Sequence, residues 1–220
     1  LILDHTPFLS NRFHIRRIIK LPPIIVTLAT MSIFRGIALL TGGSTLHEVT
    51  GPASFLFIGQ GKIAGLPFPI FIFGAVALIM LFLQTRTRFG LNVFAVGENE
   101  EAARLCGLPV TRTRVLVYII SGIGAAIGGI MLTSQVNTAW STYGTGIELD
   151  VIAAIVLGGA SLTGGTGSIS RTVIGALLIG EMNNGMSMLN VSVEQQLIAK
   201  ALIIILAIAF NDKLLKWAEK

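Results

Sequence analysis

The sequence predicts an all-α membrane protein, a polytopic bundle of about six spanning helices in one domain that covers residues 1–220. Of its 220 residues, 53% are hydrophobic and 12% are charged, whereas an ordinary globular domain is about 25% charged. The apolar residues gather in segments close to the roughly 20 residues that a helix needs to cross a bilayer. The basic residues lie between these segments in a pattern that favours one orientation in the membrane.

Five apolar segments stand out, and a sixth is shorter and rich in glycine. In chain order, the six lie at about 21–41, 66–84, 115–133, 147–163, 172–190 and 197–210. The second and third are the clearest spans. The last is short unless the polar residues before it sit at the membrane interface. The glycine-rich segment 147–163 is the weak member, and it is either a sixth span or part of a re-entrant loop.

The Lys and Arg residues indicate the orientation. If residues 1–20 are inside and the chain alternates through six crossings, most of the 16 Lys and Arg residues lie in inside segments, and only Lys62 lies in an outside loop. This bias places both ends of the chain and the long loop 85–114 in the cytoplasm. A re-entrant loop at 147–171 would leave the lysine-bearing C-terminal tail outside, which the bias disfavours. The outside loops are then 42–65, 134–146 and 191–196.

A short charged helix is predicted within the inside loop, in the stretch "AVGENEEAARLCGLPV". Asn99 can cap a helix that begins at Glu100, because an Asn side chain accepts hydrogen bonds from the free amides of the first turn. Glu100 and Glu101 then occupy the first turn, where the positive end of the helix dipole favours acidic side chains. Glu100 and Arg104 are spaced i, i+4 in the favourable order.

The same helix is predicted to end after about two turns. Gly107 suits a left-handed C-terminal cap, and Pro109 prevents the helix from continuing. Ala102, Leu105 and Cys106 form a narrow apolar edge. A helix of this length is unstable alone in water, so it must rest on something. It is either a solvated loop helix packed on its own protein, or a small knob that docks in the groove of a partner.

The glycine-rich stretch 158–168, "GGASLTGGTGS", is not a phosphate-binding loop. No Gly-Lys-Ser/Thr follows it, and it lacks a strand–loop–helix context. We interpret it as a tight turn between two membrane segments. Gly124 and Gly128, together with Gly122 and Gly129, favour close helix packing in the third apolar segment.

Polar residues inside the apolar segments are candidates for function. Glu181, Asn183 and Asn184 lie in the middle of 172–190, where an ionisable group is costly and usually faces a cavity or the bundle interior. They line a path for a hydrophilic solute, or they form hydrogen bonds between helices. Arg35 and Lys200 also fall within spans, where snorkelling or a structural ion pair is the default.

No catalytic, metal or nucleotide site is indicated. His5, His14 and His47 lack the spacing of metal ligands, and no nucleophile stands beside a base. Cys106 is the single cysteine, so no intrachain disulfide forms. The net charge of +5 follows the inside loops, which points to membrane topology rather than to nucleic acid.

Several stretches, in order, resemble the membrane permease subunit of bacterial ABC importers for monosaccharides such as ribose, xylose and rhamnose. They are "LPPIIVTLATMSIFRGIALLTGG", "FIGQGKIAGLPFP", "TRFGLNVFAVGENEEAARLCGLPV", "GTGIELDVIAAIVLGGASLTGGTGSI" and "NNGMSML". The resemblance covers the chain from about residue 16. It implies a multi-pass protein of the bacterial cytoplasmic (inner) membrane that is not itself an enzyme and needs no cofactor.

The resemblance also implies partners. A second permease subunit, the same or a paralogue, completes the translocation path through the lipid. A separate ABC ATPase subunit drives it, and an extracytoplasmic sugar-binding protein delivers the solute. The segment 97–108 matches the family's coupling helix, which favours the interpretation that the short helix docks in the groove of a partner. The ATPase-coupling residues are then Glu98, Asn99, Glu100, Glu101, Ala102, Ala103, Arg104, Leu105 and Gly107.

Two further sets of residues are expected to serve transport. Glu181, Asn183 and Asn184 would line the sugar path. Glu148 and Asp150, at the outer end of a span, would help to receive the binding protein, or they merely cap a helix.

Departures from the family pattern leave alternatives open. The chain lacks the family's first helices and their "GGIDLSVG"-like motif, so we expect a truncated product or partial sequence. Arg171 stands where the family commonly has glycine. The alternatives are a secondary transporter driven by an ion gradient and a non-functional permease remnant. Branched-chain amino acid importers are distant relatives, so a non-sugar solute is a further alternative.

Overall fold

The computed structural model describes residues 23–43, 45–49 and 51–218, and this part of the chain forms two compact units. The first unit comprises the described residues up to Glu48 together with Thr138–Tyr143, and the second comprises the described residues of Val49–Asn137 and those from Gly144 onward. The described elements, in order, are α2 (Pro23–Gly42), β1 (His47–Glu48), α3 (Ala53–Gln60), β2 (Lys62–Ile63), β3 (Leu66–Pro67), α4 (Phe68–Arg86), α5 (Arg88–Glu98), α6 (Glu100–Leu105), α7 (Val110–Val136), β4 (Thr138–Ala139), α8 (Ile147–Leu157), α9 (Ile169–Met188) and α10 (Val193–Ala218).

The first unit is the helix α2 with a small two-stranded sheet. The strand β1 pairs antiparallel with β4, so that His47 lies opposite Ala139. The Ser141 hydroxyl reaches the carbonyl oxygens of Ala38 and Gly43, at 3.0 and 3.1 Å, and so holds the loop after β4 on the end of α2.

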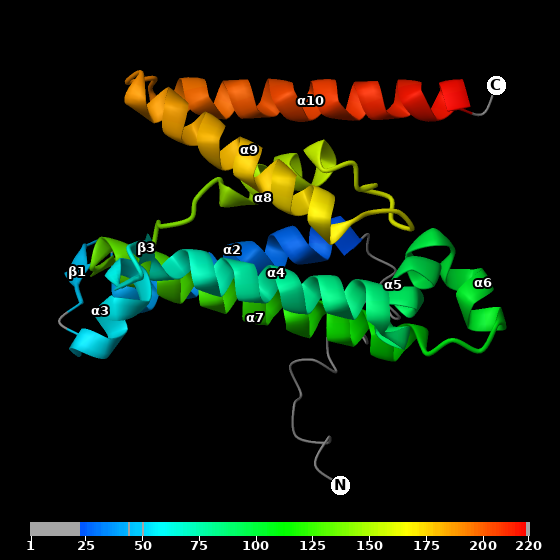
Figure 1. Ribbon diagram of the computed structural model, residues 1–220, viewed down its shortest axis with the longest axis horizontal. Helices are drawn as coiled ribbons and strands as arrows, with labels where there is room; N and C mark the ends of the chain where they lie inside the picture. The colour runs from blue at the N-terminus through cyan, green and yellow to red at the C-terminus, as the bar shows by residue number, and fades with distance from the viewer. Residues whose placement is uncertain (1–22, 44, 50, 219–220) are drawn as a thin grey trace, which may run out of the picture. The chain divides into compact units, whose positions relative to one another are not determined.

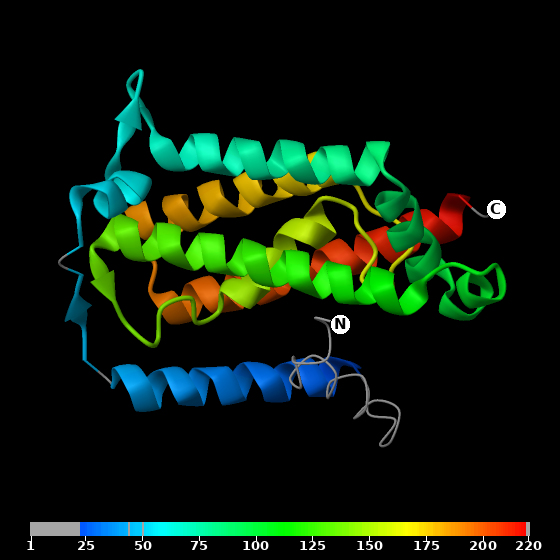
Figure 2. The same cartoon turned by 90° about the horizontal axis from the view of Figure 1, so that it is seen from below.

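In the second unit, α4, α7, α9 and α10 run lengthwise between two ends (Figures 1 and 2). One end carries α3 and the β2–β3 hairpin, and the other carries α5, α6 and the loop before α9. The helix α4 runs toward the α6 end, α7 returns from it, α9 starts there and α10 comes back to it. The loop before α9, residues 158–168, is called the glycine loop below.

Three described helices are long and apolar enough to cross a membrane, namely Ile25–Gly42 in α2, α4 and α7. These correspond to the first three predicted segments. The helix α9 has 20 residues, but Arg171, Glu181 and two asparagines make it less apolar. The prediction of a mostly helical membrane protein is therefore confirmed, whereas the count of six spans is not.

The prediction of one continuous span over 147–163 does not hold, because α8 ends at Leu157 after 11 residues. At 1.5 Å per residue, such a helix covers about 16 Å, roughly half of the hydrocarbon thickness. Gly159 has a φ of +72°, and the amides of Gly159 and Ala160 bond back to Val156 and Ile155. This pair of bonds is the Schellman motif that ends many helices.

The glycine loop continues the course of α8 toward the α6 end of the unit (Figure 1). Irregular backbone at membrane depth must satisfy its polar groups within the protein. The loop does so in part by itself, since the Ser161 amide donates to Thr166 and the Gly164 amide donates to Ser161. The segment 147–168 is therefore half helix and half loop, and it is called the broken span below. The prediction of a tight turn over 158–168 is wrong, because these residues form an extended loop between Leu157 and Ile169 rather than a close reversal of the chain.

The buried core of the second unit lies among α8, α9 and α10. Ala153, Ala154 and Ile179 are buried there, with Met182 and Ile204 packed against them. A separate contact joins α3 to α7, where the fully buried Ser134 hydroxyl donates to the Phe55 carbonyl at 2.6 Å and accepts from the Gly59 amide at 2.8 Å.

The four glycines of α7 do not pack closely within the described chain. A Cβ atom built on Gly122, Gly124, Gly128 or Gly129 meets no described atom within 4 Å. The close-packing interpretation of these glycines is thus wrong for contacts inside this part of the chain.

Candidate functional site: helix α6 and the elements that hold it

The helix α6 begins as its sequence predicts. The Asn99 side chain accepts hydrogen bonds from the amides of Glu101 and Ala102, both at 3.0 Å. Glu100 and Glu101 occupy the first turn. The Arg104 guanidinium donates to the Glu100 carboxylate at 3.1 Å, which confirms the expected i, i+4 pair.

The end of α6 also follows its sequence. Gly107 has a φ of +76°, a conformation that side-chain-bearing residues rarely adopt. The amides of Gly107 and Leu108 bond back to Arg104 and Ala103, so the helix ends in a Schellman motif. Local capping at both ends thus compensates for the small length of the helix.

The two sides of α6 differ in exposure. Ala103 is buried, with 4% of its surface exposed, where α6 lies against α5 and α7. Leu105 is 84% exposed, and Ala102 and Cys106 are exposed as well. The apolar edge of Ala102, Leu105 and Cys106 is therefore open in this chain, whereas Ala103 faces its own protein.

Glu100 joins α6 to α7, near the start of that helix. Its carboxylate accepts from Arg104 on one side and from Arg114 on the other. Arg114 is largely covered, with 24% of its side chain exposed. A carboxylate held by two guanidinium groups fixes the angle at which α6 leaves the bundle. A hollow of about 380 Å³ lies beside this junction, with Arg104 and Arg112 on its wall.

The helix α5 touches the glycine loop backbone to backbone. A Cβ atom on Gly97 would lie 2.7 Å from the Gly165 nitrogen, and one on Gly164 would lie 2.6 Å from the Gly97 oxygen. No side chain fits at either position without movement. The Glu98 carboxylate lies directly beside Gly165. Glu98, predicted as a coupling residue, therefore lies against the glycine loop.

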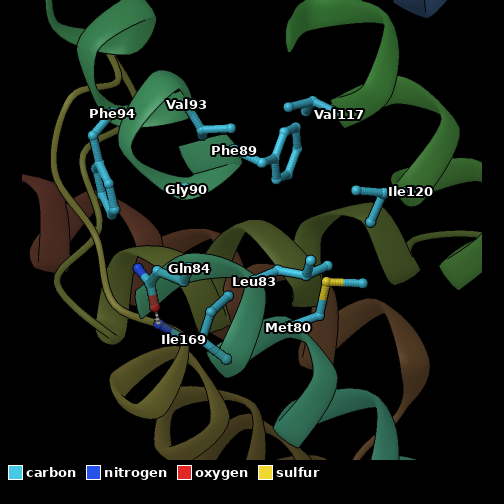
Figure 3. A pocket seen from close by; sticks show the side chains of 10 residues that line it. All are labelled: Met80, Leu83, Gln84, Phe89, Gly90, Val93, Phe94, Val117, Ile120 and Ile169. Carbon is cyan, nitrogen blue, oxygen red and sulfur yellow. Dashed lines mark hydrogen bonds between the residues drawn. The ribbon is translucent and has the colours of Figure 1, made fainter. Parts of the chain in front are cut away.

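Gln84, near the end of α4, holds the other end of this loop. Its amide nitrogen donates to the Gly167 carbonyl at 3.1 Å, and its amide oxygen accepts from the Ile169 backbone nitrogen at 2.9 Å. Figure 3 shows the second of these bonds at the edge of an apolar cavity of about 240 Å³, with Phe89 and Val117 on its wall. Such apolar walls strengthen the bonds of Gln84 by excluding water.

A charged cluster lies among the three C-terminal helices. The Lys200 ammonium on α10 is 2.7 and 3.0 Å from the two carboxylate oxygens of Asp150 on α8. The Asn183 amide on α9 donates to the same carboxylate at 3.1 Å. Lys200 is buried, with 9% of its surface exposed. The structural pair expected for Lys200 is confirmed, and Asp150 is its partner.

The predicted path residues separate onto two sides of α9. Asn183 turns toward α8 and Asp150. Glu181 and Asn184 are exposed on another part of the helix surface. Glu148, predicted with Asp150 as a contact for the binding protein, is partly buried in the first turn of α8. The roles of these residues in transport remain predictions.

Sequence reasoning missed two features of this site. Gln84 carries no motif, and only the topology reveals that it faces the glycine loop, 83 residues further along the chain. Arg114 was assigned only to membrane orientation, and no local signal pairs it with Glu100, 14 residues earlier in the chain. In the described chain, no group of three His, Cys, Asp or Glu side chains could hold a metal ion.

Comparison with known proteins gives consistent relatives. The chain is 41% identical over 195 residues to the ribose import permease protein RbsC of Bacillus subtilis, a match that covers 88% of this chain and 61% of the relative. It is 41% identical over 201 residues to the L-arabinose transport system permease protein AraH of Escherichia coli, covering 91% and 61%. It is 40% identical over 197 residues to RbsC of E. coli, covering 88% and 61%.

The chain thus spans about three fifths of the length of these curated relatives. No solved structure matches it significantly. Its apolar helices and its permease relatives indicate a multi-pass inner-membrane protein. Residues 10–209, nearly the whole chain, match the family model described as branched-chain amino acid transport system, permease component. The chain belongs to this permease family.

Proposed function

We propose that this chain forms the membrane-spanning part of a permease subunit in an ATP-binding-cassette importer for a monosaccharide. The observation that carries the proposal is the open apolar edge of α6, on a helix that is otherwise capped and held rigidly. Permease relatives named for ribose and L-arabinose, at about 40% identity, support the solute class. The subunit hydrolyses no ATP itself and receives work from a partner.

The helix α6 is the dock for an ABC ATPase subunit. Ala102, Leu105 and Cys106 enter an apolar groove of the ATPase, and Glu101 and Arg104 make charged contacts at its rim. An exposed leucine at the end of a rigid helix fits a place in an interface, because removing its apolar side chain from water is favourable. Ala103 and Glu100 hold the helix on its own subunit instead.

The α6 end of the bundle faces the cytoplasm. The end of α4, the start of α5 and the start of α7 lie here (Figure 1), and these positions carry Arg86, Arg88, Arg112 and Arg114, as the positive-inside rule requires. Because α10 returns to the same end, the C-terminal lysines are also cytoplasmic. The broken span ends on the same side of the membrane as a full span would. Successive segments of the chain therefore still cross the membrane in alternating directions.

The exposed face of α9 lines the solute path. Glu181 and Asn184 lie there at mid-helix, and a charged group that faced lipid would be costly. A water-filled path shared with a second permease subunit removes this cost. An extracytoplasmic binding protein delivers the sugar to the end that carries α3, where Glu148 contributes to its reception.

Uptake measurements test the proposal. The permease is reconstituted in proteoliposomes with its ATPase and binding protein, and uptake of labelled ribose, L-arabinose and leucine is followed with and without ATP. We expect ATP-dependent uptake of one sugar and none of leucine. Uptake of leucine alone would contradict the solute class. Uptake driven by an ion gradient without ATP would identify a secondary transporter.

Cys106 provides a direct test of the dock, because it is the single cysteine and is exposed. A thiol-reactive photocrosslinker on Cys106 should capture the ATPase subunit. Leu105→Asp should abolish this capture, whereas Leu162→Asp, at another exposed leucine on the glycine loop, should leave it intact. Capture that is unaffected by Leu105→Asp would refute α6 as the dock.

A further inference from the structure

We propose that Gln84 and the Gly97–Gly164 contact join helix α5 and the broken span into one rigid unit, so that a displacement of α6 reaches α8. These are positioning residues for transport. The inference rests on the proposed function in one respect only, namely that α6 is the part which the ATPase moves.

The first step is the link between α6 and α5. A single residue, Asn99, separates the two helices, and its amide bonds back to Ala95 of α5 while its side chain caps α6. Ala103 is buried at the same junction. No flexible linker therefore lies between α5 and α6, and the two helices move together.

The second step is the contact between α5 and the glycine loop. Gly97 and Gly164 meet through backbone atoms at a distance that excludes a Cβ atom on either residue. Gly164 also has a φ of +103°, which disfavours any other residue there. Backbone atoms have no rotamers that could absorb a displacement, so a push from α5 moves the loop itself.

The third step is the attachment of the loop at its far end. Gln84 holds Gly167 and Ile169 by two hydrogen bonds from one side chain. The loop is thus held by α5 near its middle and by α4 at its end. The loop continues into α9 at Ile169 and, at its other end, into α8, whose Asp150 is clamped by Lys200 and Asn183. Movement at α5 therefore reaches the charged cluster.

Transport per ATP hydrolysed gives a first test in the assembled importer. Gln84→Ala removes both bonds without adding an atom, and Gly97→Ala adds a methyl group at the contact. We expect each to lower uptake per ATP by about tenfold, within the usual range of coupling between sites. Two matched controls should keep the wild-type ratio: Thr85→Ala, which loses only a bond to its own helix, and Gly74→Ala, whose Cβ meets no described atom.

A distance measurement tests the same inference independently of transport. Spin labels are placed on Cys106 and on Leu162→Cys, which is exposed on the glycine loop. We expect a narrow distance distribution that ATPase binding leaves unchanged, and a broader one in Gln84→Ala but not in Thr85→Ala. If the wild type shows no ATP-driven uptake, the proposed function fails while this measurement still applies.

Two results would overturn the rigid unit. One is an equal width of the distance distribution in the wild type and in Gln84→Ala. The other is a wild-type ratio of uptake to ATP hydrolysis in both Gln84→Ala and Gly97→Ala. If Gly97→Ala fails to fold, Gln84→Ala alone decides the question, because it removes atoms and causes no clash.

Discussion

Neutralising one member of the Asp150–Lys200 pair should destabilise the bundle strongly, and neutralising both should not. The two charges lie 2.7 Å apart and are 20% and 11% exposed. The pair and Asn183 connect α8, α9 and α10, so they hold the broken span against two full-length helices. Lys200→Met leaves a carboxylate with one amide partner, and Asp150→Asn leaves a buried ammonium without a countercharge.

The magnitude follows from the burial of the pair. Removing one partner of a buried pair costs about 3–5 kcal/mol, since the remaining charge stays desolvated. Because both groups keep some exposure, we expect the lower end, about 3 kcal/mol for each single variant. This corresponds to a change of roughly a hundredfold in the folding equilibrium. The double variant Asp150→Asn/Lys200→Met should recover to within about 1 kcal/mol of the wild type.

Equilibrium unfolding in mixed detergent–SDS micelles, followed by helical circular dichroism, measures these differences. The double-mutant cycle should give an interaction energy of at least about 2 kcal/mol. Lys62→Met, which removes an exposed charge in the β2–β3 hairpin, serves as the control and should change stability little. Additive effects of the two single variants would show that the pair contributes nothing as a pair, and would refute the reasoning.

Three further changes probe local contacts. Gly59→Ala places a methyl group 2.3 Å from the Gln135 nitrogen, so α3 should separate from α7 at a cost of about 1–3 kcal/mol, seen as a lower Tm; an unchanged Tm would contradict this. Asn99→Ala should cost α6 about 1 kcal/mol, seen as faster amide hydrogen exchange confined to α6. A backbone hydrogen bond and the Ser192 hydroxyl hold the pKa of Glu194 below its usual 4.5. The stability that this carboxylate adds is therefore present above pH 4.5 and is lost as the pH falls through the lowered pKa. Ser192→Ala should raise this pKa in an NMR titration, and an unshifted titration would exclude the hydroxyl as a cause.

The helix α6 could be predicted from sequence almost in full, because its determinants are local. Asn99, the Glu100–Arg104 pair and Gly107 act within a few residues of each other, and each behaves as its type and position indicate. What the pattern could not provide was the orientation of the helix on the bundle. Ala102 and Ala103 are neighbours with the same side chain, yet one is open and the other is buried.

The broken span could not be predicted for a related reason. After Asp150, apolar residues continue to the end of α8 without a charge or a proline, and hydropathy alone does not report where the helix ends. The glycines at 158 and 159 indicated a turn, but a turn after a half-length helix and a turn after a full span give the same local signal. The pairing of Asp150 with Lys200, 50 residues apart, likewise depends on which helices become neighbours.

The size of α6 constrains how any force acts on it. Six residues cannot form a stable helix alone, so a partner that pulled on a loosely attached α6 would unwind it rather than move the bundle. The structure holds the helix at two points, through Ala103 and Asn99 against α5 and through Glu100 to Arg114 on α7. A push on Leu105 is therefore divided between α7, which is long enough to cross the membrane, and α5, which contacts the glycine loop. Because α7 is a continuous helix and the glycine loop is held by α5, the same push should tilt α7 as a rod and displace the segment 147–168 together with α5.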